Sequence, residues 1–545
     1  MPITHKEFSP VVLILATAVF ISIFANSSFF QELTAIYPIN SDNVLFLAST
    51  LIILIALTAF LLAVISPGRL LKPLLIFALL TSASAAYFMD SYHVIIDDVM
   101  LLNLLETDRA EALDLLSLRQ GIYLLGLGII PSYFIASIRV KRSTLLKHAV
   151  SRMSFLFACV AVIAVTLLAS GDSYASFFRE HKQVRFYANP SYAFYSATEF
   201  VADSFANSAK PYQEIGLDAK HVNKDNRRKL VVMVVGETLR SDHLSLNGYE
   251  QETTPKLEEL HLASLPHVSA CGTSTAVSVP CMFSFFGQDN YSQADALNTD
   301  NVLDVIQRSG VHVAWFDNNS DSKGVADRVP HFDFKSPDNN PLCDIECRDL
   351  GMTSSLRAYT NSVPEDDILI VLHSMGNHGP AYYKRYPQSF EKFLPTCHNN
   401  QLEQCSSREI INTYDNAVLY TDYFLSQTIN ELESLSEKFE TLLLYVSDHG
   451  ESLGEHNLYL HGLPYSIAPK EQKEVPILVW LSDRWPARKR LYDNLSHWHN
   501  SGSHDNVSHS LLGILDVQTS LYDPSKDFFA PGHEQRGAVE NYASN

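Results

Sequence analysis

The sequence predicts a membrane protein in two parts, a bundle of five transmembrane helices followed by an α/β domain with a central, mostly parallel sheet. Three observations lead to this fold class. The chain has 545 residues, too many for one ordinary domain. Its first third contains five long apolar stretches, and the remainder alternates short apolar runs with polar segments long enough for helices.

Each of the five apolar stretches has close to the roughly 17–25 residues that a helix needs to cross a bilayer. The stretches are residues 10–30, 44–65, 73–89, 121–138 and 153–169. The first resembles a cleaved signal in composition, but the four later spans favour an anchored protein. We therefore expect a multi-pass membrane domain over residues 1–170.

The loops between the spans differ in charge, and basic loops stay in the cytoplasm. Residues 1–9, 66–72 and 139–152 together hold eight Lys or Arg and one acidic residue. Residues 31–43 and 90–119 hold two basic and nine acidic residues. This difference predicts a cytoplasmic N-terminus and an α/β domain outside the cell membrane.

Two segments link the spans to the α/β domain, which we place at residues 226–545. In the outer loop, residues 97–119, leucines recur at three- and four-residue steps between acids, which predicts an amphipathic helix near the membrane surface. Residues 171–225 are rich in Phe and Tyr. They suit a bridge on the headgroup layer, although packing between domains explains them equally well.

Six of the seven cysteines fall into close pairs late in the chain, whereas Cys159 lies alone in an apolar run. The pairs are Cys271/Cys281, Cys343/Cys347 and Cys397/Cys405. They predict disulfide bonds and an oxidising compartment, with six buried free thiols as the alternative. The net charge of −20 lies after residue 170, which disfavours nucleic-acid binding.

Five short apolar runs predict buried strands of a sheet covered on both faces. They are LVVMVV (230–235), VHVAWF (311–316), ILIVLH (368–373), LLLYVS (442–447) and VPILVW (475–480). Polar residues follow three of them: Glu237 after the first, His378 after the third, and Asp448–His449 after the fourth. Functional groups gather at the carboxyl ends of such strands, so these residues predict a site.

Glu237, Asp448 and His449 offer oxygen and nitrogen ligands without thiolate, a set that suits catalytic Zn²⁺. Each residue alone has a simpler explanation, since an acid after a strand often caps a helix and a lone histidine often makes a structural hydrogen bond. Their recurrence at several strand ends favours the metal site.

The stretch CGTSTAVSVPC (271–281) contains four hydroxyls, three of them before a predicted helix and one inside it, and phosphate binds well at a helix start. A zinc-bound hydroxyl there would become a nucleophile, and a disulfide would stiffen its loop. Helix capping is the alternative. The residues alone leave Thr273, Ser274, Thr275 and Ser278 equivalent.

Several longer motifs resemble the phosphoethanolamine transferases that modify lipid A in the Gram-negative envelope, a family that includes polymyxin-resistance enzymes. These motifs are GETLRSDHLSLNGYEQETTP (236–255), CGTSTAVSVPC, WFDNNSDSKGV (315–325), GNHGPAYYKRYP (376–387), YDNAVLYTDY (414–423) and SDHGESLGEHNLYLHGLPY (447–465). The resemblance covers essentially the whole chain and implies an α/β domain of alkaline-phosphatase-like type.

The resemblance also implies site residues, and it selects Thr275 as the nucleophile. The implied zinc ligands are Glu237, Thr275, Asp448 and His449, with catalytic His378 and His461 beside substrate phosphate or a second metal. The implied substrate-binding residues are Asn103, Thr107, Glu111, Ser320, Lys323, His378 and His461. The pair His504–Asp505 also matches a motif, but we interpret it as a helix cap.

The activity that the resemblance implies is a two-step transfer from phosphatidylethanolamine to lipid A phosphate, through a phosphothreonine-type intermediate and with one tightly bound Zn²⁺ or two. The expected protein is a monomer of the bacterial inner membrane with its catalytic domain in the periplasm. Its product would carry less negative charge and bind less polymyxin.

Three alternatives remain at this stage. The same chemistry could serve a core sugar or a periplasmic glucan, or move glycerol phosphate from phosphatidylglycerol. A sulfatase- or phosphatase-like hydrolase would need no acceptor, and a sulfatase would show a Cys/Ser-x-Pro-x-Arg motif, which is absent around Thr275. A non-catalytic receptor would have no need of the complete ligand set.

Overall fold

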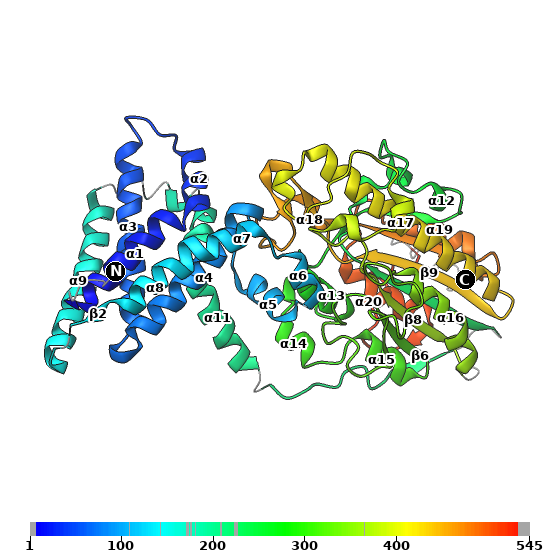
Figure 1. The fold of residues 1–545 in the computed structure, drawn as a ribbon. Helices are drawn as coiled ribbons and strands as arrows, with labels where there is room; N and C mark the ends of the chain where they lie inside the picture. The colour runs from blue at the N-terminus through cyan, green and yellow to red at the C-terminus, as the bar shows by residue number, and fades with distance from the viewer. Residues whose placement is uncertain are drawn as a thin grey trace. The chain divides into compact units, whose positions relative to one another are not determined.

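The protein forms two compact units in a computed structural model (Figure 1). The structure describes residues 7–107, 109–141, 143–169, 174, 177–179, 181–207, 210–222, 227–363 and 366–531. The first unit comprises Met1–Leu101 and Leu116–Asp203, and the second comprises Leu102–Leu115 and Ser204–Asn545. The domain boundaries drawn from the sequence at residues 170 and 225 stay a prediction.

The first unit is helical. Its helices are α1 (Pro10–Phe24), α2 (Ser27–Ile36), α3 (Val44–Ile65), α4 (Leu71–Tyr92), α7 (Leu118–Tyr123), α8 (Ile130–Ser137), α9 (Leu145–Ala169) and α11 (Ser191–Asn207), with a π-helical segment at Leu124–Ile129 between α7 and α8. The two-residue strands β1 (Glu7–Phe8) and β2 (Arg139–Val140) pair in parallel.

Five spans agree with the helices of this unit. In the described part of the chain, four helical stretches are long and apolar enough to cross a membrane: Val44–Ile65, Gly68–Tyr92, Leu118–Ser137 and Leu145–Ala169. A fifth span results if α1 and α2, which meet at 57°, count as one. The apolar stretch over residues 10–30 thus corresponds to a bent pair of helices.

Asn26 and Asn189 stabilise the bend between α1 and α2. The Asn26 amide donates to the carbonyl of Asn189 at 2.7 Å and accepts from the Asn189 backbone N–H at 2.9 Å. The Asn189 side chain donates in turn to the carbonyls of Ala25 and Ser82. A helix break buried among apolar residues needs such partners, because an unsatisfied backbone group in hydrocarbon costs several kcal/mol.

The second unit is built on a mixed sheet with strand order β5-β12-β9-β4-β8-β6-β7. The strands of this sheet are β4 (Arg228–Gly236), β5 (Ala263–Ser269), β6 (His312–Asp317), β7 (His331–Asp333), β8 (Ile368–His373), β9 (Phe439–Ser447) and β12 (Glu474–Leu481). Short antiparallel pairs join β10 (Ser452–Leu453) to β11 (Tyr459–Leu460), and β13 (Val517–Gln518) to β3 (Lys220–His221).

All five strands expected from the apolar runs are present, and the sheet is mostly parallel. Strand β12 runs antiparallel to β9 and β5, because the chain between β9 and β12 forms a loop and short elements instead of a helix that crosses the sheet. Strands β5 and β7 were not expected. They lie at the two edges, and Pro266 interrupts the apolar pattern of β5.

Helices cover both faces of this sheet (Figure 1). They are α12 (Pro255–Glu258), α13 (Thr275–Phe283), α14 (Gln293–Leu297), α15 (Val302–Ser309), α16 (Leu350–Ser362), α17 (Ser407–Leu435), α18 (Lys470–Lys473), α19 (Arg488–Ser496) and α20 (Val507–Ile514). Val231, Met233 and Val235 of β4 share one buried core with side chains of α13, α15 and α20. Helix α17 packs against β9, with α16 beside it.

The outer loop, residues 97–119, contains two short helices, α5 (Asp98–Glu106) and α6 (Arg109–Asp114), where the leucine pattern predicted one. Asp108 between them lies outside the described residues. Most of this loop belongs to the second unit. Parts of the predicted bridge over residues 171–225 also lie outside the described residues.

Three disulfide bonds are present among the described residues, and they join the three predicted pairs: Cys271–Cys281, Cys343–Cys347 and Cys397–Cys405. Cys159 is a buried free thiol. The alternative of six free thiols is therefore wrong. The pairing fits a domain that folds in an oxidising compartment.

Thiol titration tests this pairing. Denatured, unreduced full-length protein should react with one equivalent of thiol reagent, since only Cys159 is free. Prior reduction should raise the value to seven, the cysteine content of the sequence. A Cys159→Ala variant should give zero before reduction. Three or more reactive thiols in the unreduced protein would contradict the pairing.

Candidate functional site

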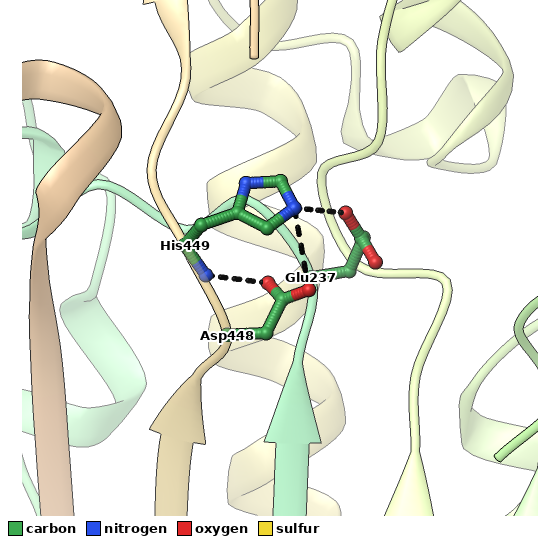
Figure 2. Close-up of side chains that lie close together, drawn as sticks. All are labelled: Glu237, Asp448 and His449. Carbon is green, nitrogen blue, oxygen red and sulfur yellow. Dashed lines mark hydrogen bonds and ion pairs between the residues drawn. The ribbon is translucent and has the colours of Figure 1, made fainter. Parts of the chain in front are cut away.

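Strands β4 and β9 bring the central residues of the site together. The two strands pair in parallel with Gly236 opposite Ser447, so Glu237 and Asp448 leave the sheet side by side (Figure 2). The register requires glycine at position 236, because a Cβ there would lie 1.9 Å from the hydroxyl oxygen of Tyr445. Strand pairing thus places the first two candidate ligands.

Glu237, Asp448, His449 and Thr275 surround one point. Thr275 Oγ1 lies 3.0 Å from Glu237 Oε2 and 3.3 Å from His449 Nε2. His449 Nε2 lies 3.5 Å from Glu237 Oε1 and 3.3 Å from Asp448 Oδ2. Ligands bonded tetrahedrally at about 2.0–2.1 Å are separated by about 3.3 Å, so the three distances from His449 Nε2 fit the coordination that Zn²⁺ prefers.

Each of the three ionisable residues keeps one atom free for a cation. Glu237 Oε2 accepts from Thr275 and Asn319, and Asp448 Oδ1 accepts from the N–H groups of Thr238 and His449. Glu237 Oε1 and Asp448 Oδ2 are buried and have no hydrogen-bond partner among the described residues. Buried carboxylate oxygens without a donor are costly unless a cation compensates them.

The electrostatics of the group also favour a cation. Burial, and then the charge of Glu237, raise the pKa of Asp448 well above its usual value. Burial would raise the pKa of Glu237 too, but the neighbouring histidines, when protonated, and the Asn319 amide lower it. Two acids so close repel each other when both are ionised. A bound cation would remove that repulsion.

His449 presents a neutral nitrogen to the group. Its Nδ1 lies 2.9 Å from the carbonyl of Gly450, which makes Nδ1 the protonated nitrogen and leaves the Nε2 lone pair facing the carboxylates. Burial, and then His461, lower the pKa of His449 to about 3. A metal-binding histidine is commonly oriented in this way by a carbonyl at its other nitrogen.

The structure separates the four hydroxyls of CGTSTAVSVPC. Helix α13 begins at Thr275, whose hydroxyl faces the ligand group. Ser274 occupies the N-cap position, and Thr273 Oγ1 donates to the carbonyl of Leu463 at 2.6 Å. Ser278 Oγ donates to the carbonyl of Asp448. The last two bonds hold the loop against the segments that carry the site.

His461 and His378 lie beside His449. The ring centroids of His449 and His461 are 4.4 Å apart, and those of His461 and His378 are 5.5 Å apart. His461 Nδ1 lies 2.9 Å from Glu451 Oε2, and Glu451 also accepts from the hydroxyl of Tyr382 at 2.7 Å. Glu451 therefore fixes the His461 ring with its Nε2 available for proton transfer.

Sequence reasoning missed Asn319 and Glu451. Asn319 donates to Glu237 Oε2 at 2.9 Å and to the carbonyl of Ser374 at 2.8 Å, which fixes the Glu237 side chain. Both missed residues follow the carboxyl end of a strand, Asn319 after β6 and Glu451 after β9. Extending the strand-end argument to every polar residue after a strand would have included them.

Three of the predicted substrate-binding residues, Ser320, Lys323 and Asn103, have contacts that relate helix α5 to the loops of the site. Lys323 Nζ donates to the Ser320 carbonyl at 2.9 Å and lies 3.5 Å from Glu106 Oε2 of α5. Asn103 of α5 lies close to Gly462, the residue after His461. A Cβ built on Gly462 would lie 3.6 Å from Asn103 Nδ2.

Of the other two outer-loop residues, only Thr107 has a described side chain. Thr107 Oγ1 donates to the carbonyl of Asn103, within its own segment. The side chain of Glu111 lies outside the described residues. Helix α5 therefore lies near the two segments that carry Lys323 and His461. Glu106 pairs with Lys323, and Asn103 lies beside Gly462.

The cap expected at His504–Asp505 is wrong in its residues. Ser503 and Asn506 form the capping box, and His504 is buried. The Cys271 N–H donates to His504 Nδ1 at 3.1 Å, and His504 Nε2 lies 2.9 Å from the Ser447 carbonyl. His504 thereby ties the loop that carries Thr275 to the end of β9.

A second cluster, Asp317, Asp321 and His331, also has the spacing of a metal site. Asp317 already accepts from Trp315 Nε1 at 2.8 Å and pairs with His373 at 3.0 Å. We assign it no role in binding a metal.

Comparison with known proteins shows which family the chain is similar to over its length. The Sulfatase family model matches residues 229–517, and the model described as Phosphoethanolamine transferase EptA/EptB matches residues 54–205. Phosphatidylethanolamine transferase Mcr-1 of Escherichia coli is 41% identical over 94% of this chain and 96% of its own length. The chain belongs to the phosphoethanolamine transferases.

Two further relatives extend the comparison of this transferase. The structure of the integral membrane protein lipooligosaccharide phosphoethanolamine transferase A (EptA) from Neisseria meningitidis has a TM-score of 0.92 and 32% identity, covering 96% of this chain and 100% of that one. This match confirms the predicted fold class. The Kdo(2)-lipid A phosphoethanolamine 7''-transferase of Salmonella typhimurium is 28% identical over 81% of each chain.

Zinc binding tests the ligand group of the transferase. Metal-free protein should bind zinc, and Glu237→Gln should bind at least about 100-fold more weakly, because it loses a ligand and not merely an outer partner. Competition with a chromogenic chelator measures both affinity and stoichiometry. A stoichiometry above one would indicate a second ion near His378 and His461.

The matched control is Asp422→Asn. Asp422 is also a buried carboxylate, but it accepts from the backbone N–H groups of Lys256 and Leu257 and is not part of the ligand group. Its zinc affinity should equal that of the wild type. Equal affinity of wild type and Glu237→Gln would refute the assignment.

Proposed function

We propose that this transferase moves phosphoethanolamine from phosphatidylethanolamine to a phosphate of lipid A, through a covalent intermediate on Thr275. One observation carries the proposal: the Thr275 hydroxyl lies at the start of α13 and within 3.0–3.3 Å of two of the three buried candidate ligands. The names of the relatives support the choice of donor and acceptor.

Glu237, Thr275, Asp448 and His449 would hold one zinc ion. Bound zinc would lower the pKa of the Thr275 hydroxyl and offset negative charge on the transferring group. The chain contributes an orienting framework: Asn319 fixes Glu237, Gly450 fixes His449, and the Cys271–Cys281 disulfide closes the loop around Thr275.

In the first half-reaction, Thr275 Oγ1 attacks the phosphorus of phosphatidylethanolamine. A bond forms between Thr275 and phosphorus, and the bond from phosphorus to the glycerol oxygen breaks. Diacylglycerol leaves with the proton that Thr275 gives up, which His378 or His461 transfers to the glycerol oxygen. The positive end of the α13 dipole and the Lys323 ammonium would stabilise the charged phosphoryl group.

In the second half-reaction, a lipid A phosphate oxygen attacks the phosphorus on Thr275. The threonine oxygen leaves and regains its proton, and a phosphoethanolamine–phosphate linkage forms. His461 suits proton transfer because Glu451 holds its Nδ1 side and leaves Nε2 available. A covalent intermediate means that the two lipid substrates need not be bound together.

The membrane part suits this reaction. Both substrates are lipids, and anchoring in the inner membrane raises their effective concentration near a periplasmic site. Hydrophobic helices alone do not select transfer over hydrolysis, but they favour lipid substrates. The added ethanolamine would reduce the negative charge of lipid A and weaken its binding of cationic polymyxin.

Mass spectrometry of the intact protein tests the nucleophile. Incubation with phosphatidylethanolamine and zinc, without acceptor, should add one phosphoethanolamine mass that maps to Thr275. Thr275→Ala should give no adduct, whereas Thr275→Ser keeps the hydroxyl and should retain it. An adduct on another residue, or an adduct in Thr275→Ala, would refute the intermediate.

Lipid analysis of cells tests the acceptor. Expression of the wild type in a Gram-negative host should add phosphoethanolamine to lipid A, and Thr275→Ala should leave lipid A unchanged. Modified core sugar or glucan with unmodified lipid A would replace the proposed acceptor. Added glycerol phosphate would replace the donor, and phosphatidylethanolamine cleavage without any modified acceptor would indicate a hydrolase.

A further inference from the structure

Arg385 is a buried arginine that contacts the backbone of His378. Its side chain is 3% exposed, and Nε donates to the His378 carbonyl at 2.7 Å. A buried guanidinium must be compensated by negative charge. Asp114 of α6, at 3.0 Å from Nη2, and Glu346, paired with Nη1, provide it.

The charges around Arg385 form a balanced cluster, which we name the Arg385 cluster. It comprises Asp114, Asp344, Glu346, Arg348, Lys384 and Arg385, three acids and three bases. Arg348 pairs with Asp344 and donates to the Lys384 carbonyl, and the Lys384 ammonium pairs with Asp114. The Cys343–Cys347 disulfide closes the loop that supplies Asp344 and Glu346.

Asp114 fits this cluster closely. Its side chain is 9% exposed, both carboxylate oxygens are paired, and its backbone carbonyl accepts from Asn400 at 2.6 Å. Asp114 comes from the outer loop between two predicted spans, more than 270 positions before Arg385 in the sequence. The loop therefore contributes an essential charge to the interior of the second unit.

The segment that carries His378 is anchored on its other side as well. The N–H groups of Met375 and Gly376 donate to Asp349, and the N–H of Asn377 donates to the carbonyl of Glu237 at 3.0 Å. Arg385 is the anchor that follows His378. Together these bonds fix the His378 backbone between the candidate metal ligand and the Arg385 cluster.

We propose that Arg385, oriented by Asp114 and Glu346, is a positioning residue for His378, and that the outer loop thereby completes the catalytic centre. The inference rests on the proposed function for the role of His378. It does not require Arg385 to touch substrate. Displacing His378 slightly is expected to slow the reaction, because errors of about 1 Å in a reacting group can cost about 100-fold in rate.

Steady-state kinetics of the full-length protein test this proposal. Diacylglycerol release from phosphatidylethanolamine, in detergent micelles that also contain lipid A as acceptor, should show kcat about 10- to 100-fold lower in Arg385→Lys and Asp114→Asn, with little change in KM. The matched control is Arg328→Lys. Arg328 makes a similar two-pronged ion pair with Asp304, outside the site, so its kcat should be unchanged.

A double-mutant comparison separates positioning from general destabilisation. In a His378→Ala background, Arg385→Lys should cause little further loss, because its effect passes through His378. Equal losses in both backgrounds, or a rise in KM alone, would overturn the proposal.

Hydrogen exchange provides a readout without turnover. The backbone amides of residues 375–379 should exchange faster in Arg385→Lys and Asp114→Asn than in the wild type, and should be unchanged in Arg328→Lys. Unchanged exchange in both cluster variants would overturn the proposal. Failure of the wild type to cleave phosphatidylethanolamine would instead count against the proposed function, and the exchange comparison would still decide the positioning role.

Discussion

The site depends on the burial of two carboxylates beside each other at the ends of β4 and β9. Parallel pairing puts Glu237 and Asp448 side by side, and burial makes their mutual repulsion expensive. Each uses one oxygen for hydrogen bonds and leaves the other free, and His449 adds a neutral nitrogen. The surrounding loops are arranged around a point at which a bound cation would be stabilised.

Several anchors keep that point rigid, and they come from distant parts of the chain. Asn319 fixes Glu237, Glu451 fixes His461, and His504 joins the loop of Thr275 to the end of β9. The disulfide Cys271–Cys281 closes the nucleophile loop in the covalent structure itself. Preorganisation of this kind would let the side chains face the phosphoryl group of the proposed reaction without reorganising.

Much of the fold followed from local patterns. The apolar lengths gave the membrane-spanning stretches, and five apolar runs gave five strands of the sheet. Patterns failed where a distant partner decides the outcome. Asn189 stabilises the bend after α1, the edge strand β5 is interrupted by Pro266, and β12 reverses direction because no helix crosses the sheet before it. Such outcomes depend on contacts between residues far apart in sequence.

By itself, the sequence determined the kinds of chemical group available and their places after strands, because strand ends and apolar periods are local properties. It also placed Glu237, Asp448 and His449 in one candidate site. Only the tertiary structure distinguished the Thr275 hydroxyl from its three neighbours on physical grounds, since that choice depends on which oxygen faces the ligand group. Only the tertiary structure showed that Asp114 pairs with Arg385. The two residues are far apart in sequence, and no spacing along the chain indicates that they are in contact.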